Sequence, residues 1–103
     1  MVQRAFGVAS FSSNTGGPQH QDVPIALVPP FQDAIPVLTG FNVEFTPRDD
    51  HNFGQLYVDV SLRDKNTDTG FVVVRCTYGL RDWSDEFDDK YDGTISFVVI
   101  GIP

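Results

Sequence analysis

The sequence has little cysteine, little positive charge and no long apolar run. Cys76 is the only cysteine among 103 residues, which excludes an intrachain disulfide and a cysteine-rich zinc site. Seven Lys and Arg residues against fourteen Asp and Glu residues give a formal net charge of -7, which argues against nucleic acid and anionic membranes as partners. No apolar run approaches the roughly 18 residues that a membrane-spanning helix needs, so we expect no membrane insertion.

The beginning of the chain also lacks the apolar core of a secretory signal peptide. Together with the single cysteine, this predicts synthesis in the cytoplasm and leaves open release by another route. The length is that of one domain, and 41% hydrophobic residues, nine of the aromatics being Phe, are enough for a core. We therefore predict a single domain over residues 1–103.

No window of the sequence has clean helical periodicity, and short apolar runs alternate with segments rich in Gly, Pro, Asn, Asp and Ser. The longest such segments, expected to be loops, are 12–18, 46–50, 64–70 and 79–93. The pattern predicts an all-β sandwich or barrel with six strands. These strands are expected at residues 2–11, 23–28, 35–45, 55–63, 71–78 and 94–102.

Two of the expected strands are apolar on both faces. The runs 72–74 and 97–100 contain only Val, Phe and Ile. A strand in a two-layer sandwich buries one face, so the second face of these strands must be covered. We expect either an oligomer whose subunits pack sheet against sheet or a segment of the same chain that folds across the outer face. By contrast, residues 55–63 alternate strictly, with Leu56 and its successors on one face and a polar or ligand-facing second side.

Residues that carry catalysis are scarce. The sequence has no nucleophile-elbow motif, no phosphate-binding glycine loop and no zinc-protease motif. Cys76 stands inside an apolar strand and is expected in the core or an interface. His20 and His51 lie far apart in polar sequence, which is typical of solvated side chains rather than metal ligands. We expect no enzyme and no metal site.

The acidic segment 81–92 interleaves aromatic residues with carboxylates. Flat aromatic faces stack on sugars and carboxylates accept hydrogen bonds from hydroxyl groups, so this segment predicts a carbohydrate site. Calcium is a weaker alternative, because the spacing differs from that of the EF-hand loop. A structural reading also stays open, in which Trp83 and Phe87 attach the loop to the domain.

Several short motifs, in their order, resemble the H-type lectin domain over about residues 23–102. They are Val28-Pro29-Pro30-Phe31, Ile35-Pro36-Val37, Phe41-Asn42-Val43, Thr69-Gly70-Phe71, Cys76-Thr77-Tyr78 and Tyr91-Asp92-Gly93-Thr94-Ile95-Ser96-Phe97. The resemblance implies a six-stranded antiparallel β-sandwich that forms trimers, or hexamers of two stacked trimers. It also implies shallow sites between subunits for galactose or N-acetylgalactosamine (GalNAc), and agglutination of cells through multivalent binding.

Carried over by residue, the resemblance assigns pocket aromatics to Tyr78 and Tyr91. Tyr57 stands where the family has an arginine, and Gly79 stands where the family has a polar, histidine-like residue. Asp22 and Asn14 are the candidates for the aspartate of the family's N-terminal loop.

The segment with Asp82 and Trp83 is an insertion relative to the family. We therefore expect a site formed by Tyr57, Tyr78, Trp83 and Tyr91, with Asp22, Asp82 and further acids up to residue 92 as acceptors.

The resulting hypothesis is a non-enzymatic lectin that recognises galactose-like or GalNAc-like glycans, needs no cofactor and forms homotrimers or homohexamers. The alternative is a structural or protein-interaction module that keeps the oligomeric fold without a working sugar site. The departures at Tyr57 and Gly79 favour this alternative. A calcium-dependent binder is the third option.

Overall fold

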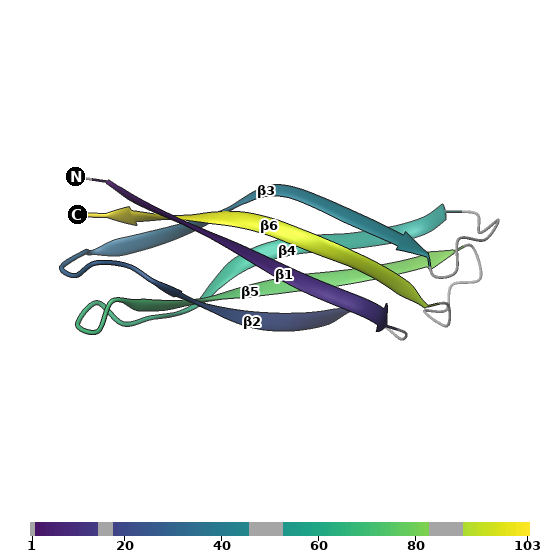
Figure 1. Ribbon diagram of the computed structural model, residues 1–103, viewed down its shortest axis with the longest axis horizontal. Helices are drawn as coiled ribbons and strands as arrows, with labels where there is room; N and C mark the ends of the chain where they lie inside the picture. The colour runs from purple at the N-terminus through teal and green to yellow at the C-terminus, as the bar shows by residue number, and fades with distance from the viewer. Residues whose placement is uncertain (1, 15–17, 46–52, 83–89) are drawn as a thin grey trace.

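The computed structural model describes residues 2–14, 18–45, 53–82 and 90–103, and all of their regular structure is strand. Figure 1 shows these strands running along one long axis. The expected all-β class is confirmed, and the described chain contains six strands, as predicted. The strands are β1 (Gln3–Asn14), β2 (Gln19–Ala26), β3 (Asp33–Phe45), β4 (Phe53–Lys65), β5 (Phe71–Asp82) and β6 (Tyr91–Ile102).

The six strands form two three-stranded antiparallel sheets, packed face to face as in a β-sandwich. One sheet has the order β1-β6-β3 and the other has the order β2-β5-β4. The two central strands, β5 and β6, carry most of the buried core residues. The chain ends lie together at one end of the sandwich, and Asn14, Phe45 and Tyr91 mark strand ends at the other (Figure 1).

Several predicted strand boundaries were wrong. The structure extends β5 to Asp82 and begins β6 at Tyr91, so both ends of the predicted loop 79–93 are strand. Likewise, β2 begins at Gln19 rather than at residue 23. The polar and glycine residues in these places pair with a neighbouring strand, as Gly79 does with Tyr57. A polar residue whose side chain faces water can continue a strand, so the polar residues did not mark where these strands end.

The alternation predicted for residues 55–63 is confirmed. On β4 the apolar residues pack partly buried against the core, while Tyr57 and Asp59 are exposed on the opposite face. The core also contains Cys76, as expected, with no exposed surface. Burial is the largest cause that raises the pKa of the Cys76 thiol to about 11. The thiol therefore stays protonated and behaves as a small apolar side chain.

The connection from β4 to β5 is fixed by a turn in which Asn66 supplies most of the hydrogen bonds. Its side-chain oxygen accepts from the backbone N–H groups of Asp68 at 3.0 Å and Thr69 at 3.1 Å. Gly70 closes the turn with a φ of 89°, and its N–H donates to the Asn66 carbonyl at 3.0 Å. The Gly70 carbonyl then accepts from the N–H of Leu27 at 2.7 Å, which joins this turn to the end of β2.

Candidate functional site

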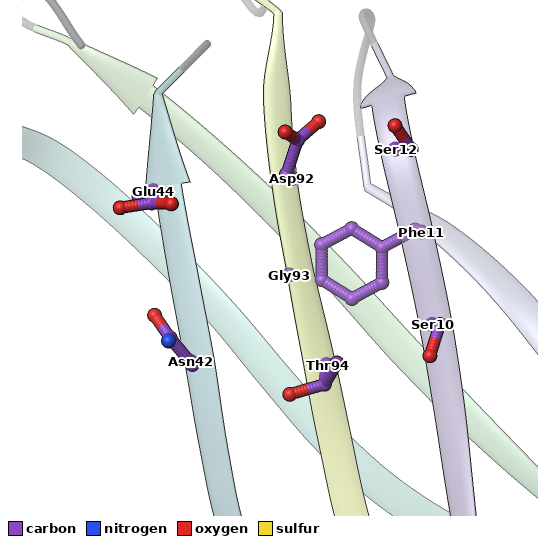
Figure 2. A pocket seen from close by; sticks show the side chains of 8 residues that line it. All are labelled: Ser10, Phe11, Ser12, Asn42, Glu44, Asp92, Gly93 and Thr94. Carbon is purple, nitrogen blue, oxygen red and sulfur yellow. The ribbon is translucent and has the colours of Figure 1, made fainter.

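A shallow depression of about 340 Å³ lies on the outer face of the β1-β6-β3 sheet, at the end where β6 begins. Figure 2 shows side chains from all three strands around it. Most of them are small polar or acidic side chains, with one glycine and one phenylalanine. The lining residues are Ser10, Phe11, Ser12, Asn42, Glu44, Asp92, Gly93 and Thr94.

The strand register explains why these residues meet. Ser10 is opposite Thr94, which is opposite Asn42 on the far side of β6. Two residues further along, Asp92 is opposite Glu44. Because side chains alternate between the faces of a sheet, residues two apart on each strand share the outer face. Figure 2 shows this arrangement, with the polar groups of β3, β6 and β1 side by side.

Alternation turns Gly93 toward the interior, where its missing side chain leaves room for the ring of Phe11 beneath the depression. A Cβ atom at this position would overlap the carbonyl oxygen of Asn42 and would lie 2.8 Å from the ring of Phe11. No larger residue fits there without a shift of the backbone. The surface between the polar side chains is therefore formed by backbone and by the edge of one aromatic ring.

The depression combines three kinds of hydrogen-bonding group. Ser10, Ser12 and Thr94 carry hydroxyls that both donate and accept, and Asn42 carries an amide that does the same with separate atoms. Glu44 and Asp92 carry carboxylates that accept only. A surface of this composition can match a ligand that has several hydroxyl groups close together.

The two tyrosines expected in the sugar pocket lie in the interior of the chain. Tyr78 is 3% exposed and Tyr91 has no exposed surface. Phe11 brings them together, because its ring is stacked on Tyr78 with centroids 3.9 Å apart and meets the edge of Tyr91 at 5.8 Å. In a single chain, these tyrosines form an aromatic cluster that stabilises the end of the core.

The hydroxyl groups of these two tyrosines differ. Tyr78 receives a hydrogen bond from the side-chain amide of Gln21 at 3.2 Å. The same amide donates to the carbonyl of Ser10 at 2.7 Å, and so connects the two sheets. Within the described residues, the buried hydroxyl of Tyr91 has no hydrogen-bond partner. Burial raises the pKa of Tyr91, and Tyr78 is a smaller cause in the same direction.

Tyr57 and Asp22 share the outer face of the other sheet, away from the depression. Tyr57 is 40% exposed. Asp22 accepts hydrogen bonds from Arg75 at 3.0 and 3.3 Å and forms an ion pair with Arg63 at 3.2 Å. The hydrogen bond from Arg75 is the main cause that lowers the pKa of Asp22. These contacts give Asp22 a structural role on this face.

The remaining predicted residues belong to the acidic segment. Asp82 ends β5 with its backbone opposite Phe53, and Trp83 lies outside the described residues. His51 is also outside them, while His20 is exposed on β2. Among the residues that the structure describes, no three His, Cys, Asp or Glu side chains gather as metal ligands. Nor does this part of the chain contain a helix that could cross a membrane.

Sequence reasoning identified one side of the depression and missed the others. Asp92 was among the acids expected to accept hydrogen bonds from a sugar, whereas Ser10, Asn42 and Thr94 were read only as parts of strands or loops. One sequence pattern could have identified these residues. Polar residues recur two positions apart near the same end of three strands, at 10 and 12, at 42 and 44, and at 92 and 94.

Comparison with known proteins gives no family model that matches the chain, and no significant match to a curated protein or to a solved structure.

Proposed function

We propose that this protein is a non-enzymatic carbohydrate-binding protein and that the depression on the β1-β6-β3 sheet is its sugar site. The observation that supports the proposal most directly is the convergence of hydroxyl, amide and carboxylate groups from three strands on one shallow surface. A sugar ring presents hydroxyl groups that donate to Glu44 and Asp92 and accept from Asn42 or Thr94. Hydrogen bonds to charged groups are the stronger ones, so the carboxylates are expected to dominate affinity.

A binding role without catalysis is supported by the residues around the depression. Among the residues that the structure describes, no histidine or cysteine lines the depression, and the only cysteine of the sequence is a buried thiol whose pKa is raised to about 11. The six polar side chains can orient a ligand through hydrogen bonds alone. The resemblance to H-type lectins points to the same class, with galactose or GalNAc as the first sugars to test.

A shallow site binds a single sugar weakly, and repeated sites on one assembly compensate through high effective concentration. The proposed function therefore includes several copies of the chain acting together, as the resemblance implies for a trimer or hexamer. Such an assembly would agglutinate cells whose surface carries the matching glycan. This activity gives a simple qualitative assay beside direct binding.

A second candidate is an oligomerisation module without a sugar site. The burial of Tyr78 and Tyr91 favours it, because the two aromatics expected to stack on a sugar are covered within the chain. Under this alternative, the polar groups of the depression keep one end of the sheet solvated. The two candidates differ in a single measurable property, which is glycan affinity.

The test is a glycan array with the assembled protein, run with calcium and again with a chelator. We expect hits with terminal galactose or GalNAc that the chelator leaves unchanged. The variants Asp92→Asn and Glu44→Gln should each weaken binding roughly tenfold or more, because each removes a charged acceptor. Asp59→Asn, an exposed acid on the other sheet, is the matched control and should bind as the wild type does.

A blank array with a correctly folded, assembled protein would contradict the sugar site and support the oligomerisation module. Hits that survive both depression variants would also contradict the assignment of the site. Binding that the chelator abolishes would support the calcium-dependent alternative instead.

A further inference from the structure

The outer face of the β1-β6-β3 sheet is apolar over the half that lies away from the depression. Phe6 is 74% exposed and Val8 is 56% exposed on β1. On β3, Ile35 and Val37 are 43% and 40% exposed. Val98 and Ile100 of β6 lie between them and are partly buried by these neighbours. We call these six residues the apolar face.

The register aligns the apolar face in rows across the sheet. Phe6 is opposite Val98, which is opposite Val37 on the far side. In the next row, Ile100 lies between Arg4 and Ile35. The apolar side chains are thus contiguous over three strands rather than scattered singly. Contiguous patches of this kind mark interaction surfaces, whereas single exposed apolar residues need no explanation.

The distribution of side-chain size on β1 is the reverse of that expected for a strand with one wet face. Over residues 5–9 its inward residues are small, with Ala5, Gly7 and Ala9, while Phe6 and Val8 point outward. A larger residue does not fit at Gly7, because a Cβ there would overlap the ring of Phe97. The strand therefore lies close to the core through its small residues and places its large apolar side chains on the outside.

Nothing in the described part of the chain covers the apolar face. The exposures of Phe6 and Val8 show that no described segment folds across β1. The expectation of a covering segment from the same chain is therefore not met by residues 2–14, 18–45, 53–82 and 90–103. The other expectation, contact between sheets of different subunits, is compatible with this exposure.

We propose that the apolar face packs against the apolar face of a second copy of this chain. Its composition favours this occupant, because apolar faces that resemble a domain core cut in half are typical of permanent homo-oligomers. Non-obligate interfaces are, as a whole, only about as apolar as the rest of a protein surface, whereas the rows described above contain one charged residue, Arg4.

The area available fits one further copy. The exposed parts of these side chains amount to on the order of 400 Å² per chain, so two copies would remove about 800 Å² of apolar surface from water. A standard interface buries roughly 1,600 Å² in total, of which a little over half is apolar. The apolar face and a rim of neighbouring polar groups therefore suffice for a stable contact.

The response to salt distinguishes this apolar contact from a contact held by ion pairs. Each chain carries a formal net charge of -7, so two copies repel at long range. Salt screens this repulsion and leaves the burial of apolar surface intact. Self-association through the apolar face should therefore persist or strengthen as sodium chloride is raised.

The proposal stands independently of the sugar site, and its test measures mass. Light scattering or sedimentation of the wild type should give a multiple of 11.4 kDa, at low and at high salt. Phe6→Glu should shift the mass to 11.4 kDa, or weaken association roughly tenfold or more, because it places a charge in the buried contact. Phe71→Glu is the matched control, since Phe71 is 54% exposed on the outer face of the other sheet.

Circular dichroism verifies that each variant is folded, and Val37→Lys replaces Phe6→Glu if the latter fails to fold. A wild type that is monomeric across the concentration range overturns the proposal. So does an oligomer whose mass is insensitive to both Phe6→Glu and Val37→Lys, or one that Phe71→Glu dissociates equally. Glycan binding can be lost without any change in mass, which keeps this test separate from that of the sugar site.

Discussion

The ring of Phe11 lies parallel to the ring of Tyr78, with an interplanar angle of 1° and centroids 3.9 Å apart. The two residues come from different sheets, β1 and β5, so the stack joins the layers of the sandwich. Phe11 also lines the depression, at its boundary with the core. The aromatic cluster thus supports the polar surface above it, and substitution of Phe11 should affect both stability and binding.

Phe11→Ala should lower the free energy of unfolding by about 3 kcal/mol, because it removes a buried ring and two aromatic contacts. Chemical denaturation measures this loss. Phe71→Ala is the control, since its ring is 54% exposed and its removal leaves no cavity. A loss for Phe11→Ala no larger than that of the control would contradict the role assigned to the stack.

Tyr91→Phe should leave stability unchanged or raise it by about 1 kcal/mol, because it removes a buried hydroxyl that has no partner among the described residues. Tyr78→Phe removes a hydroxyl that accepts from Gln21 and should instead cost about 1 kcal/mol. Thermal unfolding of the two variants beside the wild type measures the difference. The opposite order would mean that the Tyr91 hydroxyl is hydrogen-bonded in solution.

Gly70→Ala should destabilise the protein by about 1 to 3 kcal/mol. Gly70 has a φ of 89°, and a Cβ there would overlap the carbonyl oxygen of Leu27. Gly40→Ala is a matched control, because a Cβ at Gly40 meets no atom within 4 Å. Equal melting temperatures for the two variants would show that the turn tolerates a side chain.

Asp22 should make the stability of the protein sensitive to acid. Its pKa is lowered from 3.8, mainly by the hydrogen bond from Arg75, so the folded state favours the ionised carboxylate. The stabilisation is present above the unfolded pKa and disappears as the pH falls through the lower, folded pKa.

Asp22→Asn removes this dependence. We expect the wild type to be more stable than the variant at pH 6, and the difference to shrink as the pH is lowered below about 4. Denaturation curves at several pH values measure the difference, and 0.5 M salt should reduce it because the pair is exposed. A difference that does not change with pH would contradict the ionic origin of the contact.

Much of the fold followed from local patterns. The strict alternation at Leu56 and its neighbours predicted a strand with one apolar face, and the apolar surroundings of Cys76 predicted its burial. Both depend on a few adjacent residues, and the structure confirms both. The extension of β5 and β6 depends on cross-strand pairing between distant residues, which composition alone does not reveal.

The candidate site was less predictable for the same reason. Tyr91 stands beside acidic residues in the sequence, yet the two-residue period of β6 turns it inward and Asp92 outward. Ser10 and Thr94 are separated by most of the chain and become neighbours only through the pairing of β1 with β6. A segment that is aromatic and acidic in sequence is thus divided between core and surface.

Both chain ends lie at the end of the sandwich opposite the depression (Figure 1). An affinity tag, a fluorophore or a surface linker attached at either Val2 or Pro103 would therefore be separated from Asp92 by the length of a strand. Immobilised protein would present the depression outward. This geometry makes the protein well suited to biosensor measurements in which the chip must not compete with the ligand.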